Sequence, residues 1–149
     1  MPTKSILIYK LTPTQIALVD RLAHAENGMP MDKLDYGETI VWQELDKLGI
    51  ADMKLHRRKA VIVLTDLGAQ VRSAGYLSTK PVVRLTEAQI AALRFLASGR
   101  RHFNDIPAYM KEPARRLRLR GWATSEDVEG HFWVTLTDEG WALLKLLNH

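Results

Sequence analysis

The chain carries one sequence pattern twice, and this repeat restricts its fold more than any other feature. The segments LTPTQIALVDRLA at 11–23 and LTEAQIAALRFLA at 85–97 are identical at seven of thirteen positions, with an offset of 74 residues. A second match, with an offset of 72, joins 49–68 to 121–140, where six of twenty positions are identical. Both matches keep their order along the chain. We therefore expect two copies of one small fold, in residues 1–76 and 77–149.

Each copy opens with the signature of a helix N-terminus. Thr12 and Thr86 are each followed three residues later by a glutamine, Gln15 and Gln89, which is the spacing of a capping box. Pro13 suits the first helical position of the first copy. The apolar residues that follow recur at helical spacing, so each segment predicts a helix with one buried stripe.

Each copy then has room for two more helices. In the first copy we expect a short helix over MDKLD (31–35) and a longer one over ETIVWQELDKLG (38–49). In the second copy the corresponding helices are DIPAYM (105–110) and PARRLRLRG (113–121). Pro113 stands where a first helical residue is expected, and Gly121 where a helix ends.

A hairpin and a last helix complete each copy. The runs KAVIVLT (59–65) and HFWVTLT (131–137) are β-branched and aromatic, and each follows a shorter extended run and a turn. Thr65 and Thr137 then have the position of helix N-caps. The fold class is therefore α+β, mainly α with small β-hairpins, in the order helix, helix, helix, hairpin, helix. That order is typical of a winged helix-turn-helix unit, present here in tandem.

The residues at these boundaries resemble a known family. The pattern L-T-x-x-Q, a helix ending L-x-x-x-G, and a hairpin closing in L-T-x-x-G is similar to the winged-helix core of MarR-like bacterial and phage transcriptional regulators. It is carried by LTPTQ, LDKLGI and LTDLG in the first copy and by LTEAQ, LRLRGW and LTDEG in the second. The resemblance implies double-stranded DNA as the partner and transcription regulation as the function.

In a helix-turn-helix unit the third helix enters the major groove, and the second copy suits this role. Arginines on that helix offer paired donors to guanine edges and phosphates. Residues in the loop after the first helix of the same copy can add contacts to the DNA backbone. The DNA-binding residues expected in this copy are Lys111, Arg115, Arg116, Arg118 and Arg120, with Arg100 and Arg101 in the loop.

The first copy has the opposite distribution of charge. Its third helix exposes Glu38, Glu44 and Asp46, which repel phosphates, and leaves Thr39 and Gln43 as candidates for base contacts. Its hairpin is basic, whereas the second hairpin reads SEDVEGH. A basic hairpin can lie along a DNA backbone or reach a minor groove. The residues expected to do so are Lys54, His56, Arg57, Arg58 and Lys59.

Two arrangements follow from this asymmetry. Either the tandem units act as a built-in dimer on one duplex, or one unit binds DNA and the other serves as a protein-binding surface or scaffold. The last helix carries more apolar residues than one buried stripe needs. Gly140, Leu143, Leu144 and Leu147 fit one stripe, which leaves Trp141 and Leu146 outside it. Packing of the two copies on each other explains the excess, and homodimerisation through this helix is the alternative.

No pattern in the chain predicts an enzyme, a cofactor or a metal site. There are no cysteines, the five histidines stand at spacings that match no metal motif, and phosphate-binding glycine loops and nucleophile elbows are absent from the sequence. The N-terminal apolar run is too short for a secretory signal or a membrane span, so we expect a cytoplasmic protein without membrane association.

The competing function is that of an adaptor. Winged-helix proteins also serve as protein-protein interaction modules, for example as phage or host factors that bind another protein. The net charge of only +4 and the acidic third helix of the first copy favour this alternative. The arginine-rich helix and the basic hairpin oppose it, because neither is needed for an apolar protein contact.

Overall fold

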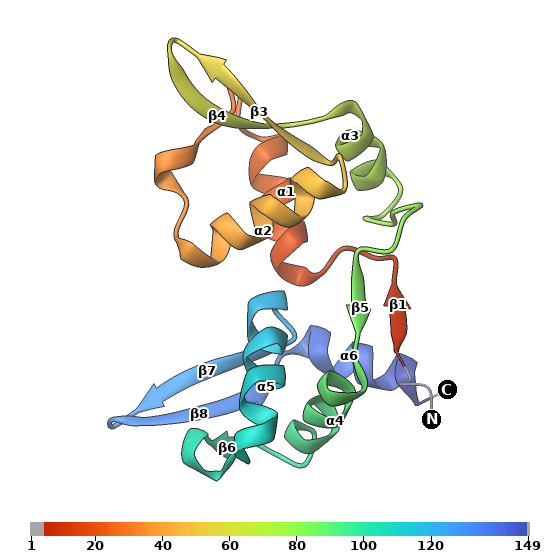
Figure 1. The fold of residues 1–149 in the computed structure, drawn as a ribbon, viewed down its shortest axis with the longest axis vertical. Coiled ribbons are helices and arrows are strands. Elements are labelled where there is room, and N and C mark those ends of the chain that lie inside the picture. Colours follow the sequence, from red (N-terminus) through yellow and green to blue (C-terminus); the bar gives the residue numbers. More distant parts are fainter. Residues whose placement is uncertain (1–4, 149) are drawn as a thin grey trace. The chain divides into compact units, whose positions relative to one another are not determined.

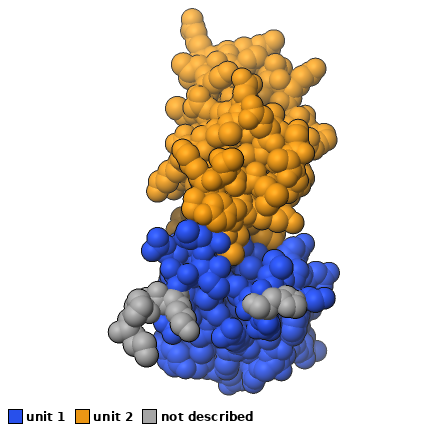
Figure 2. Space-filling view, turned by 90° about the vertical axis from the view of Figure 1, so that its right-hand side faces the viewer, with its two compact units in different colours: residues 1–7, 84–149 blue, residues 8–83 orange. Residues whose placement is uncertain are grey.

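The computed structural model describes residues 5–148 and confirms an α+β fold. Its elements divide between two compact units, residues 8–83 and residues 84–149 together with 1–7. Figure 1 labels the elements, and Figure 2 shows the two units in different colours. The expected boundary between residues 76 and 77 thus falls seven residues before the division at 83 and 84. That division lies within strand β5 (Val83–Leu85), which pairs with β1 (Ile6–Ile8) in a two-stranded sheet.

The first unit, residues 8–83, contains three α-helices and a three-stranded sheet. β4 is the central strand and pairs antiparallel with β2 on one side and β3 on the other. Its core is one cluster in which Leu18, Leu45 and Ile62 are almost fully buried. The elements are α1 (Pro13–Ala23), β2 (Met29–Pro30), the 3₁₀ helix η1 (Met31–Lys33), α2 (Tyr36–Lys47), β3 (Ala51–His56), β4 (Lys59–Leu64) and α3 (Asp66–Ser73).

The second unit repeats this order, with β8 as the central strand between β6 and β7. Leu93, Leu117 and Val134 are buried in its interior. In each unit the long hairpin projects away from the helices (Figure 1). The elements are α4 (Glu87–Leu96), β6 (Arg101–His102), the 3₁₀ helix η2 (Phe103–Asp105), α5 (Ala108–Arg120), β7 (Ala123–Val128), β8 (His131–Leu136) and α6 (Asp138–Leu147).

The capping boxes are formed as the sequence predicts. The Thr12 hydroxyl accepts from the Gln15 amide, and the Gln15 side chain accepts from the Thr12 amide; Thr86 and Gln89 do the same on α4. Pro13 is the first residue of α1. The predicted caps of the last helices are also present. The Thr65 hydroxyl accepts from the amide of Gly68, and the Thr137 hydroxyl from that of Gly140, each the third residue of its helix.

The repeated glycine of L-T-x-x-G has a packing reason. A Cβ placed on Gly68 would lie 2.3 Å from the carbonyl oxygen of Ile50, and one on Gly140 would lie 2.0 Å from that of Trp122. Only a residue without a side chain lets the last helix approach the start of the hairpin so closely. The second half of the sequence repeat therefore marks one close contact between a helix and a strand, made twice.

Two helix predictions in the middle of the copies are wrong. In the first copy the segment predicted as a short helix contributes only the 3₁₀ turn η1. In the second copy Asp105 is the last residue of η2, and Ala108–Met110 already form the first turn of α5. Pro113 does not begin a helix, because α5 already begins at Ala108 and runs through it. Proline there lacks one backbone hydrogen bond near the helix start. Burial of Ala114 and Leu117 next to it, and packing of α5 on α4, hold the helix together across that gap.

The C-terminal helix buries only part of its apolar surface. Of the predicted stripe, Gly140, Leu143 and Leu144 are buried and Leu147 is half-buried, whereas Trp141 and Leu146 are exposed. In a two-fold homodimer through this helix, the exposed apolar side chains of one copy would contact those of the other. The structure contains one copy of the chain, so the homodimer stays a prediction.

Candidate nucleic-acid interface

The basic residues of α5 surround one carboxylate. Glu112 accepts from Arg115 through two bonds, Nε to Oε2 and Nη2 to Oε1, both 2.8 Å, and from Arg116 Nε to Oε1 at 3.1 Å. The two arginines lie three and four residues after Glu112, so all three side chains share one side of the helix. These contacts, Arg115 first, lower the pKa of Glu112 to about 2. The carboxylate is therefore ionised at any working pH and holds both guanidinium groups in place.

Three further cations of this unit lie over aromatic rings. The Arg100 guanidinium is 4.4 Å from the Trp133 ring centre, that of Arg101 is 4.9 Å from Phe95, and Lys111 Nζ is 4.6 Å from Phe103. Stacking restricts the rotation of these side chains but leaves N–H donors at the guanidinium edges. Nothing in the sequence pairs these loop and helix cations with their aromatic partners, because each partner lies on another element.

The remaining arginines of α5 are less accessible than predicted. Arg118 and Arg120 are half-buried, and the Arg118 Nε is enclosed with no hydrogen-bond partner among the described residues. Leu119 is also half-buried and lies seven residues after Glu112 on the same side of α5. Arg116 is exposed, and Arg115 is half-buried but keeps 40% of its side chain accessible, so we take these two as the basic part of the helix. We call α5 with these residues the arginine helix.

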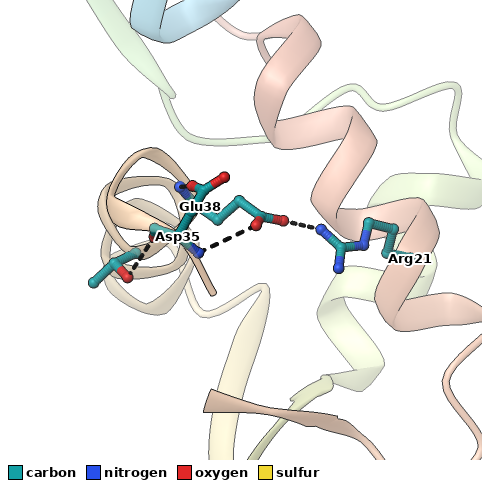
Figure 3. A network of polar contacts seen from close by, with 4 residues as sticks. Arg21, Asp35 and Glu38 are labelled. Atoms are coloured by element: carbon teal, nitrogen blue, oxygen red, sulfur yellow. Dashed lines mark hydrogen bonds and ion pairs between the residues drawn. The ribbon is translucent and has the colours of Figure 1, made fainter. Parts of the chain in front are cut away.

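The acidic residues of α2 are mostly held within the unit, contrary to the expectation that they are exposed. Glu38 completes the capping box of Asp35 and forms an ion pair with Arg21 on α1 (Figure 3). Glu44 is half-buried and accepts from the buried Gln15 at 3.4 Å. Both carboxylates therefore support the contact of α2 with α1.

The candidate base-reading residues of α2 differ in exposure. Thr39 is half-buried, and its hydroxyl donates to the Asp35 carbonyl oxygen at 2.8 Å. Gln43 is exposed, next to the exposed Asp46 and Lys47. Of the two, Gln43 is the side chain that can reach a partner without giving up an internal bond.

The hairpin of β3 and β4 brings five predicted residues together, and we call it the basic hairpin. Its strands pair from Ala51 with Leu64 to His56 with Lys59, so the turn consists of Arg57 and Arg58 alone. Both turn residues have positive φ, 50° and 68°, as a two-residue type I′ turn requires. Lys54, Arg57, Arg58 and Lys59 are exposed and His56 is half-buried. A left-handed conformation is unfavourable for arginine, so this turn is strained in both residues.

The corresponding hairpin of β7 and β8 has the same length and register but the opposite charge. Its strands pair from Ala123 with Leu136 to Val128 with His131, and the turn is Glu129 and Gly130, again with positive φ. Glu126, Asp127 and Glu129 make it acidic. We call it the acidic hairpin. The two hairpins differ in side chains while their backbones match, which makes one a natural control for the other.

Two exposed tyrosines, for which the sequence patterns predict no role, lie in the first turns of α2 and α5. Tyr36 is the first residue of α2 and Tyr109 the second of α5, and their relative exposures are 77% and 76%. Residues in the first turn of a recognition helix contact base edges in helix-turn-helix proteins. A tyrosine in the first turn of both third helices was visible in the sequence, but only the helix starts found in the structure align the two.

Two histidines that were expected to stand alone are in contact. His102 Nε2 and His131 Nδ1 are 3.2 Å apart, and His102 Nδ1 accepts from the Asn104 amide at 3.1 Å. The second bond leaves the proton of neutral His102 on Nε2, directed at His131, so the pair forms a hydrogen bond rather than a metal site. Among residues 5–148 no group of three or more potential metal ligands occurs. His149 lies outside the described residues.

A shallow open pocket of about 390 Å³ lies beside α1, β4 and α3 in the first unit. Its cation, Arg72, donates to Asp20 at 3.0 Å, and Tyr76 donates to the same carboxylate oxygen at 2.7 Å. These bonds, that of Tyr76 first, lower the pKa of Asp20. The network ties α3 to α1 and makes the cation of the pocket part of the fold. Within the described part of the chain, the helices are all too short or too polar to cross a bilayer.

Comparisons of the chain with protein-family models, with curated proteins and with solved structures gave no significant match.

Proposed function

We propose that the chain is a non-enzymatic, sequence-specific regulator that binds double-stranded DNA in the cytoplasm, and that each unit is a winged helix-turn-helix similar to the core of MarR-like regulators. The observation that supports this most strongly is the placement of the accessible cations. Cations gather on the third helix in one unit and on the projecting hairpin in the other, the two elements with which winged helix-turn-helix units contact DNA, whereas other exposed cations such as Lys145 stand apart from these clusters.

In this proposal the arginine helix lies in the major groove. Arg115 and Arg116 exchange Glu112 for phosphates or guanine edges, which is feasible because these ion pairs are solvent-exposed and weak. Tyr109 at the start of the same helix contacts a base or sugar. The basic hairpin supplies contacts to the DNA backbone through Arg57, Arg58 and Lys59, and Gln43 adds a base contact from α2. Either both units act on one duplex as a built-in dimer, or one unit alone binds.

The first experiment is enrichment of a random duplex pool on the purified full-length protein at two salt concentrations. A salt-sensitive, enriched motif supports a specific regulator, because a protein that neutralises several phosphates loses affinity steeply as salt rises. The spacing of half-sites within the motif distinguishes one bound unit from two. No retention of any duplex at low salt would refute the proposal.

Variants of the Glu112 cluster provide the site-level test. Changing Arg115 and Arg116 to Ala is expected to weaken binding by about 2–3 kcal/mol, because each contact of this kind contributes about 1–3 kcal/mol. Glu112→Gln is expected to strengthen binding several-fold, since it releases both guanidinium groups and removes a carboxylate from the interface. Lys145→Ala, which removes an exposed cation from α6, is the control. If all these variants bind DNA with equal affinity, α5 is not part of the DNA interface.

The second candidate function is a protein-interaction adaptor. It is favoured by the exposed Trp141 and Leu146 on α6, two apolar side chains that flank the buried stripe of the helix and that a protein partner or a second copy of the chain would cover. Salt separates the two functions, since an apolar interface keeps its affinity as salt rises. Homodimerisation is tested by sedimentation equilibrium of the wild type and of Trp141→Ser.

A further inference from the structure

The basic hairpin has an apolar face as well as a basic one. In an antiparallel ladder paired residues share a face and successive residues alternate. Met53 pairs with Ile62 and Leu55 with Ala60, whereas Lys54 pairs with Val61 and His56 with Lys59. The hairpin is therefore amphipathic, with Met53, Leu55 and Ala60 on one face and its strand cations on the other.

The apolar face is continuous with the core at its base and uncovered toward its tip. Ile62 is fully buried, while Met53 beside it is 49% exposed and Leu55, two residues before the turn, is 77% exposed. The backbone of the hairpin projects away from the helices of its unit (Figure 1). A leucine exposed to this degree, next to two arginines held in a strained turn, is not explained by the stability of the unit.

The side chains around Leu55 indicate an anionic occupant. Between Met53 and Ala60 the hairpin carries four permanent cations and no carboxylate. The equivalent positions of the acidic hairpin carry Ser125 for Met53 and Asp127 for Leu55. That hairpin does expose Phe132, at 53%, but among carboxylates. An exposed apolar side chain thus coincides with positive charge in only one of the two hairpins.

We propose that the basic hairpin bends the DNA it binds, with Leu55 as an apolar wedge inserted between base pairs in the minor groove and Arg57 and Arg58 on the flanking phosphates. Minor-groove proteins that kink DNA use this combination of an apolar wedge and cations. In this arrangement the Met53 side chain contacts the base-pair step next to the one that Leu55 opens. An anionic membrane is the weaker partner for this face, because two apolar side chains bury less than a single lipid chain, which itself gives only marginal anchoring. This inference rests on the proposed DNA binding and adds a deformation of the duplex to it.

Flexible pyrimidine-purine steps unstack at lower cost, so the wedge also predicts a sequence preference. We expect a TA or CA step in the enriched motif at the position the hairpin reaches. The preference arises without any hydrogen bond from Leu55 to a base.

The test separates binding from bending in the full-length protein. The duplex enriched from the random pool, labelled at both ends for energy transfer and carrying 2-aminopurine at the TA or CA step, is titrated with wild type, Leu55→Ser and Phe132→Ser. We expect wild type and Phe132→Ser to shorten the end-to-end distance and raise the 2-aminopurine signal. Leu55→Ser should lose both changes and bind about tenfold more weakly.

Binding without a change in either signal would overturn the wedge and leave the proposed function intact. Failure of the wild type to bind any duplex would instead refute the proposed function itself. Equal bending by Leu55→Ser and wild type would also overturn the proposal, since the hairpin would then bend DNA without its apolar residue. If wild type but not Leu55→Ser binds phosphatidylserine vesicles while the duplex stays straight, the membrane is the partner and the DNA proposal is wrong.

Discussion

Replacing the turn of the basic hairpin by the residues that such a turn prefers should stabilise the fold and weaken DNA binding at once. Arg57 and Arg58 both adopt positive φ, which asparagine and glycine tolerate far better in a type I′ turn. The double variant Arg57→Asn, Arg58→Gly keeps the length and register of the hairpin. It therefore removes the two guanidinium groups and the backbone strain together.

The two effects have opposite signs and separate magnitudes. Relief of the left-handed conformation at both positions, less the larger entropy that glycine loses on folding, should raise the free energy of unfolding by about 1 kcal/mol. For a unit of this size that gain corresponds to several degrees in Tm. Loss of two phosphate contacts should make the slope of log affinity against log salt less steep by about two, since each contact contributes about 0.9.

Thermal and urea unfolding followed by tryptophan fluorescence measures the first effect, and fluorescence anisotropy of a labelled duplex at several salt concentrations measures the second. Glu129→Asn is the control, because it creates the same Asn-Gly turn in the acidic hairpin, where Glu129 has a φ of 54°. That variant should gain stability without losing affinity. A double variant that is less stable than wild type would refute the strain argument, and an unchanged salt slope would refute the phosphate contacts.

Two further predictions concern stability. Gly68→Ala and Gly140→Ala should each lower the free energy of unfolding of their unit by about 3 kcal/mol or more, because the new Cβ meets a backbone oxygen. Gly37→Ala, in the first turn of α2, adds a Cβ whose one close neighbour is Asp35 Oδ1 at an ordinary contact distance of 3.5 Å, so it should be neutral or stabilising by up to about 1 kcal/mol in urea unfolding. Asp20→Asn should lower the free energy of unfolding at pH 7 by about 1 kcal/mol, a value discounted for its exposure. Since the pKa of Asp20 lies below its ordinary value of 3.8, the difference from wild type persists above pH 4 and disappears as the pH falls through the folded pKa; a constant difference down to pH 2 would contradict this.

The parts of the fold that the sequence predicted are those fixed by short-range chemistry. A threonine and a glutamine three residues apart form a capping box from local geometry alone, so α1 and α4 began where expected. The start of α5 did not, because a proline favours a first helical position only when no stronger packing extends the helix before it. Burial of Ile106 and Leu117 on both sides of Pro113 decided that boundary, and burial of this kind is a property of the tertiary fold.

The candidate site was predictable in its residue types but not in its contacts. The density of cations on α5 and on the basic hairpin is visible in the sequence. The bonds of Arg115 and Arg116 to Glu112 follow from helical spacing and could have been expected. The stacking of Arg100 on Trp133 could not be expected. The two residues are 33 positions apart in the sequence, and only the register of β6 against β8 brings them together.

Comparison of equivalent positions indicates which parts of the repeat serve the fold and which have been free to change. Gly28 packs directly on Val61 in the first unit, and the equivalent Arg100 stacks on the equivalent Trp133 in the second. The same two positions thus hold a glycine against a valine in one unit and an arginine stacked on a tryptophan in the other. The threonine caps and the close-approach glycines are the same in both units: each cap supplies an acceptor to a free amide of its helix, and each glycine leaves room for a backbone oxygen that any Cβ would meet.

The hairpins show the same principle at the surface. Their ladders have equal length and both turn residues have positive φ, yet one turn uses Glu-Gly and the other Arg-Arg. Glycine at the second position relieves strain, and the basic hairpin forgoes that relief while placing two guanidinium groups at its tip. Selection for stability alone would favour the opposite choice, since Asn-Gly is compatible with the same backbone. The strained arginines are therefore best explained by a partner with negative charge, and the duplex titrations of the Arg57→Asn, Arg58→Gly variant test that explanation directly.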